Sequence, residues 1–385
     1  MKILITLNQL IEVLGGGAKH ILEVVNYWTP VNEVTFLISE AGYEVARESM
    51  LPYPGKNAIT YRTLLDHRTR PYIIKKFVHL SRMFKTIFLS MKLRNQKYDI
   101  IIAPNFLPEN IVPVSFFKGR AKLIVFFHGG SPLSRGEELK KRGTFRRIIS
   151  MLNWEFCVGF ARIYDILFVP EISIKRYFIL RGFDPEKIIV VGNGIPFKMI
   201  SGIKGGIEEY DGVFLGQLVN GKVRDLIEVW KEVDRVVPGA KFCVIGDGPK
   251  RKELEIQARK YGLDMNFKGW ISGVEKYKLM KSSKIFVFPS YYESWGVAVA
   301  EALACGLPVV AYHQPVYREI FGNNILGVKT GDIREMAKKI IDVLENYPEY
   351  DHFRREGVQL ASRFDWKDVA NNEFLSMKKI QEAVR

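Results

Sequence analysis

The stretch from Phe286 to Ala311, FVFPSYYESWGVAVAEALACGLPVVA, limits the possible folds of this chain more than any other. An apolar run at Ile285–Phe288 precedes a polar turn, helix-forming residues at Val297–Ala304 and a second apolar run at Pro308–Ala311. A glycine and a proline between the last two runs would end the helix. Two buried strands joined by a helix form the βαβ unit of a parallel sheet, so this stretch predicts an α/β fold.

Two carboxylates mark this βαβ unit as a candidate site. Glu293 lies in the turn, and Glu301 follows eight residues later, about two turns into the helix. Both are expected at one side of a crevice at the carboxyl ends of parallel strands, where α/β proteins bind ligands. The helix N-terminus near Gly296 would offer free N–H groups to an anion. An interpretation that stays open makes Glu293 a solvated loop acid and Glu301 a helix-surface acid.

The motif E-S-W-G-V-A-V-A-E, from Glu293 to Glu301, resembles the E-x7-E motif of the retaining GT-B glycosyltransferases. This large group, of the family-four type, includes glycogen synthases and bacterial mannosyltransferases. F-P-S before the motif and A-C-G-L-P-V-V-A after it extend the resemblance, and further matches run along nearly the whole chain. The resemblance implies a GT-B fold, in which two doubly wound Rossmann-like domains face a central cleft.

The resemblance also implies a reaction, the transfer of a sugar from a nucleotide-diphosphate sugar. Glu301 would accept the ribose hydroxyls, because a carboxylate has two acceptor oxygens. Glu293 would accept hydroxyls of the donor sugar. The backbone N–H groups of Trp295, Gly296 and Val297 would lie beside it and stabilise the leaving diphosphate.

The loop Gly216–Lys222, GQLVNGK, resembles the family's G-R-L-x-x-x-K-G, whose Arg and Lys neutralise the leaving diphosphate. Lys222 matches, whereas Gln217 stands where Arg is usual and Val223 replaces the last glycine. One phosphate cation is therefore missing, which puts the rate or the donor in question. Arg224 is a candidate to compensate.

A strand at Lys2–Leu7, three glycines and an apolar-periodic run predict the first strand, glycine loop and helix of a doubly wound domain. The glycines lack the G-x-G-x-x-G spacing of a dinucleotide site. The resemblance implies that Gly16 and Gly17 form a turn beside the donor phosphate and the acceptor. The alternative is a merely flexible loop.

Two further residues enter the candidate site through the resemblance. His128 follows the predicted strand Leu123–Phe127, where the family commonly has a histidine that contacts the donor sugar. A lone histidine is more often structural, so that alternative stays open. Trp270 belongs to the segment Asn266–Ile271, which matches the strand and loop beside which the family's nucleotide base rests.

The expected organisation is an acceptor-binding domain at 1–197, a linker at 198–210 and a nucleotide-sugar-binding domain at 211–365. The linker is glycine-rich and lacks periodicity. The remaining residues, 366–385, are expected to form a helix that returns to the first domain.

The net charge of +15 predicts attraction to an anionic partner. Residues 62–97 concentrate the cations and carry apolar residues at near-helical spacing, which predicts one or two basic amphipathic helices. Such helices can lie on an anionic membrane surface, although the apolar stripe could instead dock on the sheet. Nucleic acid is not the expected partner, because none of the usual binding motifs occurs. The cations are Arg62, Arg68, Arg70, Lys75, Lys76, Arg82, Lys85, Lys92, Arg94 and Lys97.

The remaining composition favours a cytoplasmic protein that can be peripheral on the inner face of the membrane. Cys157, Cys243 and Cys305 stand far apart and suggest buried thiols in a reducing compartment. No run approaches the roughly 20 apolar residues of a spanning helix. No D-x-D pair or His/Cys cluster indicates a metal, and no cofactor is expected besides the donor substrate.

The resemblance thus implies a retaining glycosyltransferase that acts on a saccharide or lipid-linked acceptor, and the residues indicate no bound metal. Two alternatives remain. The E-x7-E context argues against a GT-B nucleotide-sugar epimerase or phosphorylase. The Gln217 departure keeps open a non-catalytic nucleotide-sugar-binding protein.

Overall fold

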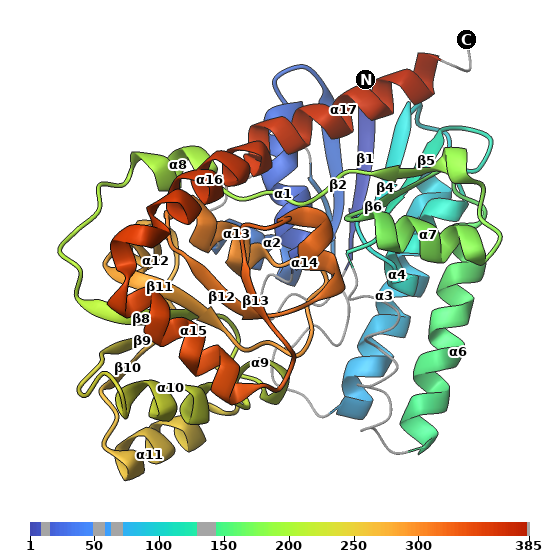
Figure 1. Cartoon of the computed structure of the whole chain (residues 1–385). Helices are drawn as coiled ribbons and strands as arrows, with labels where there is room; N and C mark the ends of the chain where they lie inside the picture. The colour runs from blue at the N-terminus through green and yellow to red at the C-terminus, as the bar shows by residue number, and fades with distance from the viewer. Residues whose placement is uncertain (9–15, 49–57, 63–71, 129–143, 383–385) are drawn as a thin grey trace. The chain divides into compact units, whose positions relative to one another are not determined.

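A computed structural model of the chain describes residues 1–8, 16–48, 58–62, 72–128 and 144–382. The chain divides into two compact units (Figure 1). The first comprises Met1–Gly192 and the chain from Lys367 onward, and the second comprises Asn193–Trp366. Each unit has one sheet in which every neighbouring strand pair is parallel. The prediction of two doubly wound α/β domains is confirmed.

The sheet of the first unit has the order β3-β2-β1-β4-β5-β6-β7. The order reverses between β1 and β4, which is the topological switch point where α/β proteins bind ligands. The strands are β1 (Lys2–Leu7), β2 (Glu33–Ser39), β3 (Ala58–Tyr61), β4 (Ile100–Ala103), β5 (Lys122–Phe126), β6 (Ile166–Val169) and β7 (Ile188–Val190).

Helices cover both faces of this sheet. Because parallel crossovers are right-handed, α1 and α2 lie on one face, and α3, α4 and α6 lie on the other. The C-terminal helix α17 packs on α1, where Trp28 Nε1 donates to the carbonyl of Ala370 at 3.0 Å. The helices are α1 (Gly16–Trp28), α2 (Glu40–Glu48), α3 (Tyr72–Leu93), α4 (Pro108–Ser115), α6 (Thr144–Ala161), α7 (Ile172–Leu180), η1 (Pro185–Lys187) and α17 (Trp366–Glu382).

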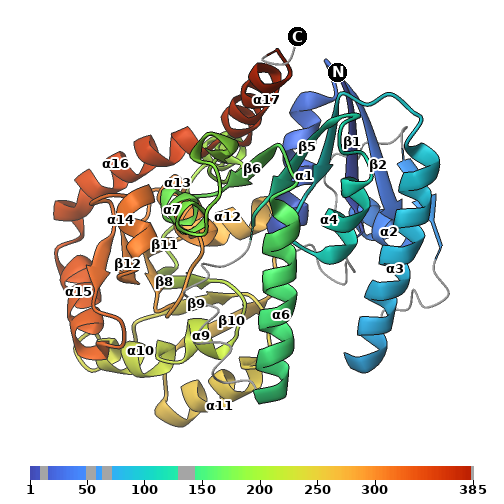
Figure 2. The same cartoon turned by 90° about the vertical axis from the view of Figure 1, so that its right-hand side faces the viewer.

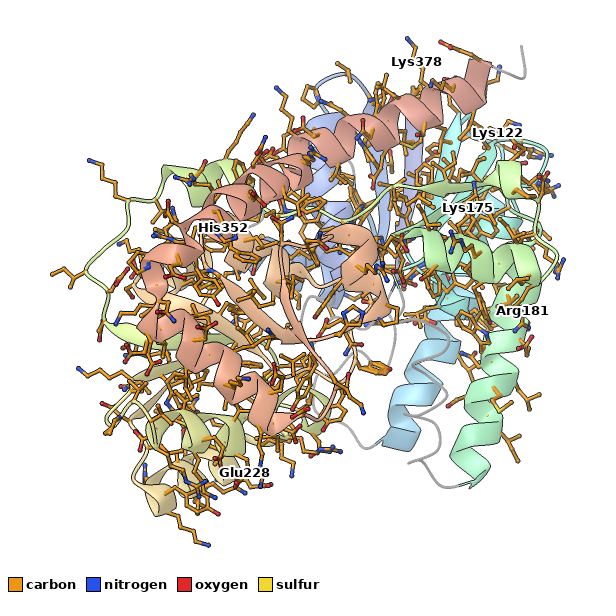
Figure 3. The ribbon with its side chains drawn as sticks, viewed as in Figure 1. Lys122, Lys175, Arg181, Glu228, His352 and Lys378 are labelled. Carbon is orange, nitrogen blue, oxygen red and sulfur yellow. The ribbon has the colours of Figure 1, made fainter. Side chains whose placement is uncertain are left out.

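Polar contacts hold α7 to its neighbours through Lys175 and Arg181, two residues that Figure 3 labels. Lys175 Nζ donates to the carbonyl of Ile188 at 2.8 Å, which ties α7 to β7. Arg181, just past the end of α7, forms an ion pair with Glu155 of α6. This ion pair holds the end of α7 to α6.

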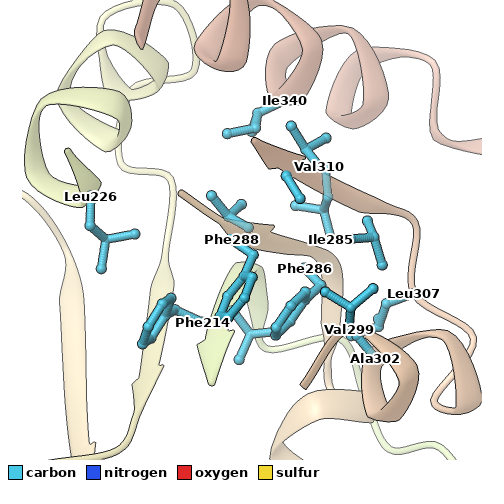
Figure 4. Close-up of a cluster of buried hydrophobic side chains, with 14 of the residues drawn as sticks. Phe214, Leu226, Ile285, Phe286, Phe288, Val299, Ala302, Leu307, Val310 and Ile340 are labelled. Atoms are coloured by element: carbon cyan, nitrogen blue, oxygen red, sulfur yellow. The ribbon is translucent and has the colours of Figure 1, made fainter. Parts of the chain in front are cut away.

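The sheet of the second unit has the order β10-β9-β8-β11-β12-β13, with its switch point between β8 and β11. Phe214, Phe286 and Phe288 of these two strands stack in the core (Figure 4). Such strands are buried on both faces, which explains their continuous apolar sequences. The strands are β8 (Tyr210–Leu215), β9 (Phe242–Ile245), β10 (Met265–Gly269), β11 (Ser283–Phe288), β12 (Val309–Tyr312) and β13 (Leu326–Val328).

Helices also connect the strands of the second unit. Val299 and Ala302 of α13 pack into the same core as the three phenylalanines (Figure 4). The helices are α8 (Phe197–Gly202), α9 (Asn220–Val223), α10 (Leu226–Asp234), α11 (Arg251–Tyr261), α12 (Gly273–Lys281), α13 (Val297–Ala304), α14 (Pro315–Ile320), α15 (Ile333–Glu345), η2 (Tyr347–Tyr350), α16 (Asp351–Ala361) and η3 (Ser362–Phe364).

The structure differs from the expected boundaries in three places. Gly16 and Gly17, expected in a loop, are the first two residues of α1, while Gly15 lies outside the described residues. The four-residue edge strand β3 was not predicted. The segment 198–210 belongs to the second unit and contains most of α8. Within the described residues, no helix combines the length and apolar content needed to cross a membrane.

The division after Gly192, rather than at residue 197, has a physical cause. The backbone of Ile195 accepts from Trp366 at 3.1 Å and donates to Phe364 at 2.8 Å. The Trp366 ring covers Gly194 so closely that a Cβ at residue 194 would lie 2.1 Å from a ring carbon. Residues 193–197 are therefore held to the end of the second unit.

Gly194→Ala should destabilise the second unit by about 3 kcal/mol, the upper part of the range for overpacking, because the Trp366 ring must move. Gly206→Ala is the matched control, since a Cβ there would meet nothing within 4 Å. Its effect should stay within about 0.5 kcal/mol. Urea unfolding followed by Trp fluorescence measures both, and equal stabilities would show that the ring yields without cost.

Candidate functional site

The loops after β8 and β9 in the second unit approach each other at backbone contact distance. Gly246 has a φ of +143°, and a Cβ there would lie 1.9 Å from the carbonyl oxygen of Gly216. The N–H of Leu218 donates to the carbonyl of Asp247 at 2.9 Å. Only glycine fits this approach. The contact fixes Gly216 and the exposed Gln217 just past the carboxyl end of β8.

The structure brings together two predicted site residues, Lys222 of α9 and Glu293 of the loop after β11. Lys222 Nζ lies 2.7 Å from Glu293 Oε1, and Ser290 Oγ donates to the same oxygen at 2.9 Å. The N–H of Tyr291 donates to the carbonyl of Gly221 at 2.8 Å, which ties the two segments together. The Lys222 and Glu293 side chains are 28% and 11% exposed, so Glu293 is not a solvated loop acid.

Glu301 is buried, at 3% exposure, so it is not a helix-surface acid. Lys276 Nζ donates to both of its carboxylate oxygens at 2.9 Å, and Tyr277 OH donates to Oε1 at 2.8 Å. Both partners come from α12. Sequence reasoning missed them, because only tertiary packing brings this helix to Glu301.

The N-terminus of α13 begins at Gly296, whose φ is +97°. A Cβ at residue 296 would lie 2.8 Å from the Tyr317 ring, so glycine is required there. Trp295 is buried with its ring against Phe321 and Phe364. Its side chain therefore belongs to the core, and only its backbone remains for the predicted role. The backbone N–H of the half-buried Val297 is in the first turn.

The arginine that could replace the missing cation is engaged in a polar network. The Arg224 guanidinium lies 4.0 Å from the Tyr291 ring centroid and donates to the Tyr291 hydroxyl. The buried Asp225 accepts from the hydroxyls of Tyr291 and Tyr312, each at 2.6 Å. Burial, together with the hydrogen bond to Asp225, raises the pKa of both tyrosines. Whether Arg224 compensates for Gln217 stays a prediction.

Trp270 lies directly after β10, and its side chain is 67% exposed. An exposed indole offers a free face for stacking. No contact of this ring with the other predicted site residues is present among the described residues, so its role beside a base stays a prediction.

In the first unit the structure brings Gly17 and His128 together. A Cβ at residue 17 would lie 3.1 Å from the Cβ of His128, which explains a small residue there. The His128 ring stacks on Phe126 and lies 4.4 Å from the His20 ring, centroid to centroid. Burial, and secondarily the charge of His20, lower the pKa of His128 well below its usual value. His20 was not singled out from the sequence.

Over the described ranges, no three His, Cys, Asp or Glu side chains converge in a way that could hold a metal ion. The groups that do meet are two lysine–glutamate pairs in the second unit, Lys222 with Glu293 and Lys276 with Glu301, and two histidines in the first. This set can accept hydroxyl groups and oppose negative charge.

Two family models match the chain, one in each unit. The model described as "Glycosyltransferase Family 4" matches residues 14–198, and "Glycosyl transferases group 1" matches residues 208–359. Between them they span most of the chain. The chain belongs to the GT-B glycosyltransferases of the family-four type.

Curated relatives show the same kinship at low identity. One subunit of phosphatidylinositol N-acetylglucosaminyltransferase from Arabidopsis thaliana is 26% identical over 54% of this chain and 48% of its own length. Glycogen synthase of Mycobacterium tuberculosis is 30% identical over 41% of this chain and 40% of its own. Phosphatidyl-myo-inositol mannosyltransferase of Mycobacterium leprae is 27% identical over 35% of this chain and 38% of its own length. The matched regions span about half or less of these relatives.

Solved structures share the fold over nearly the whole chain. Anabaena Alr3699/HepE, crystallised with UDP, superimposes with a TM-score of 0.74 at 17% identity over 98% of this chain and 100% of its own. Sucrose-phosphate synthase from Thermosynechococcus elongatus gives 0.73 at 15% identity, covering 99% of each chain. At these identities the likeness establishes the fold.

Lys276→Met should destabilise the second unit by about 3 kcal/mol, because it leaves the buried Glu301 carboxylate without its cation. Lys278→Met, one residue beyond Tyr277 on the same helix, removes only an exposed ion pair with Glu275 and should change stability by less than about 0.5 kcal/mol. Urea unfolding measures both variants. Equal effects would mean that the ammonium group of Lys276 is not needed to keep the Glu301 carboxylate buried.

Proposed function

We propose that this protein is a retaining glycosyltransferase that moves a sugar from a nucleotide-diphosphate sugar to an acceptor hydroxyl. The observation that carries the proposal is the pairing of Lys222 with Glu293 at 2.7 Å, beyond the carboxyl ends of β8 and β11. These two strands flank the switch point of the unit that matches the group 1 model. The UDP named with Anabaena Alr3699/HepE supports a nucleoside diphosphate as leaving group.

Each residue has a distinct part in the proposed reaction. The bond between the anomeric carbon and the diphosphate oxygen breaks, and negative charge develops on the diphosphate. Lys222 and the first N–H groups of α13 oppose that charge. Glu293 accepts hydroxyls of the sugar, and Glu301 accepts those of the ribose.

The leaving phosphate takes the acceptor's proton as the new bond forms on the same face of the sugar, so configuration is retained. The donor substrate is the only small molecule besides the acceptor in this proposal, because Lys222 and the α13 amides supply the positive potential. Trp270 beside the base, Gly216 and Gln217 at the diphosphate, and His128 at the sugar complete the proposed donor contacts.

The non-catalytic alternative rests on the missing second cation. Gln217 is exposed, and Arg224 is engaged with Tyr291. Nucleotide release from a panel of sugar nucleotides, with and without lipid-phosphate acceptors, separates the two functions. A binding protein would retain the nucleotide sugar and release no nucleotide.

We further propose that the first unit rests on an anionic membrane face and receives a lipid-linked acceptor there. The described part of α3 directs polar side chains as well as Leu93 into the core, and it exposes phenylalanines to solvent. Arg82, Thr86 and Ser90 are fully buried, whereas Phe84 and Phe88 are 65% and 52% exposed. Arg82, expected among the surface cations, therefore faces inward.

A second helix on the same face of the sheet also exposes apolar side chains. Both α3 and α6 pack against α4 and so flank it on one face of the sheet (Figure 2). Ile148, Met151, Leu152 and Phe156 of α6 are exposed. Exposed apolar side chains gathered on two helices of one face favour a partner there.

Charge favours lipid as that partner. The sequence of α3 contains no acidic residue, and Lys85 and Lys92 are exposed beside its phenylalanines. Apolar side chains flanked by lysines are typical of helices that lie in an anionic lipid interface. A second copy of this chain would bring the same positive charge against itself.

Lys222→Ala should lower turnover by about 100-fold or more, the scale of losing one group that stabilises the transition state. The missing cation at residue 217 should make the loss larger than usual. Lys250→Ala, which removes an exposed pair with Glu253, is the matched control and should keep normal turnover. Near-normal turnover of Lys222→Ala in a nucleotide-release assay would remove Lys222 from the site.

Phe84→Ser with Phe88→Ser should reduce binding to vesicles that contain anionic lipid more than tenfold, because each buried Phe contributes about 2 kcal/mol. Lys85→Glu with Lys92→Glu should weaken binding and its salt dependence. Ile256→Ser in α11 alters a similarly exposed apolar residue of the second unit and is the control. This variant should bind the vesicles as well as the wild-type protein does. Sedimentation at low and high salt measures this.

If the protein stays in the supernatant with acidic vesicles at low salt, the membrane proposal is wrong. A concentration-dependent dimer that the Phe84 and Phe88 changes dissociate would instead assign the α3 and α6 faces to a second copy of the chain. In either case a soluble saccharide acceptor becomes the better proposal.

A further inference from the structure

The histidine proposed to contact the donor sugar is supported by a second buried histidine. His128 lies between Gly17, Phe126 and the ring of His20. Its Nε2 is buried and has no hydrogen-bond partner among the described residues. A neutral imidazole nitrogen can donate or accept one hydrogen bond, which suits a sugar hydroxyl.

His20 is itself fixed by a residue from the far end of the chain. Its Nε2 lies 2.7 Å from Oε1 of Glu373 in α17, and neither side chain is exposed to solvent. Burial raises the pKa of Glu373, and the charge of His20 offsets part of this increase. The other carboxylate oxygen of Glu373 has no hydrogen-bond partner among the described residues.

Stabilising the packing of α17 on α1 does not by itself explain the buried contact between His20 and Glu373. A buried ion pair contributes little net stability, because desolvation offsets the attraction between the charges. The hydrogen bond from Trp28 to Ala370 already joins α1 to α17. A role beyond adhesion is therefore indicated for Glu373.

We infer that Glu373 is a positioning residue for His128 and acts through the ring of His20. The inference rests on the proposed function, in which His128 contacts the donor sugar. Glu373 holds the His20 ring at its place beside His128 and holds a positive charge there. Burial already favours the neutral form of His128, and a charge on His20 adds to this effect, so the Nε2 of His128 stays available to a hydroxyl.

The other charged groups around His20 are few among the described residues. Lys19 and Glu23 of α1 interact with this region, and burial raises the pKa of Glu23 while Lys19 and His20 lower it. Glu373 comes from α17, and His128 follows β5. Of these groups, Glu373 is the one in direct contact with the His20 ring nitrogen.

The test follows the imidazole nitrogens by NMR in the full chain labelled with ¹⁵N-histidine. The chain has six histidines, and the signal lost in His128→Ala identifies His128. Glu373→Gln removes the carboxylate in contact with His20, and with it the positive charge that the inference assigns to the His20 ring. Since a neighbouring positive charge lowers the pKa of an imidazole, its loss should raise the pKa of His128 above the wild-type value.

Trp28→Phe is the matched control, because it removes the other described bond between α1 and α17 without touching His20. It should leave the His128 titration unchanged. If Glu373→Gln does not fold, His20→Gln removes the same charge directly and must give the same upward shift. An unchanged His128 pKa in the folded variant would overturn the inference.

Kinetics supply a second readout. Glu373→Gln should lower turnover on the order of tenfold through misplacement of His128, and it should have no further effect in a His128→Ala background. Trp28→Phe should keep normal turnover. If the wild-type chain transfers no sugar, the proposed function fails, while the NMR titration still decides whether Glu373 controls His128.

Discussion

Parallel pairing of the strands is the constraint on which the rest of this structure depends. Since neighbouring strands run the same way, the loops that follow them meet at one edge of each sheet. Lys222 follows β8 and Glu293 follows β11, and these strands are neighbours although their residues lie far apart in sequence. In the first unit, the same rule brings His128 after β5 beside Gly17 at the start of α1.

Charges at this edge already satisfy one another. Lys222 pairs with Glu293, and the buried Glu301 is held by Lys276 and Tyr277. In the proposed reaction, a diphosphate at Lys222 would therefore compete with a carboxylate, and a ribose at Glu301 would compete with an ammonium group. Such competition lowers ground-state affinity, but it leaves the cation available when charge develops on the leaving group. Pairing of this kind is compatible with transfer of the sugar.

Local sequence was sufficient for much of the fold and for part of the site. The bounds of α13 were predicted to the residue, because Gly296 and Gly306 flank an uninterrupted run of helix formers. Lys222 and Glu293 were found through motifs of neighbouring residues. Lys276, Tyr277 and the pair of His20 with Glu373 were missed, since tertiary packing alone brings them to their partners. The hydrophobic period located α3 but did not show that its polar stripe faces inward.

The same free-energy cost applies to the inward-facing polar side chains of α3 and to Glu373 of α17, which is buried against His20. Burying Arg82 or Glu373 costs free energy unless a partner compensates, so neither helix is positioned by hydrophobic burial alone. Arg82 donates to the backbone carbonyl of Asn8, just past β1, and Glu373 contacts His20 of α1. Arg82 thus reaches the carboxyl end of β1, and Glu373 reaches the first half of α1. Helices at opposite faces of the sheet therefore each direct a buried polar group toward the first βα unit, the same unit in which Gly17 lies against His128.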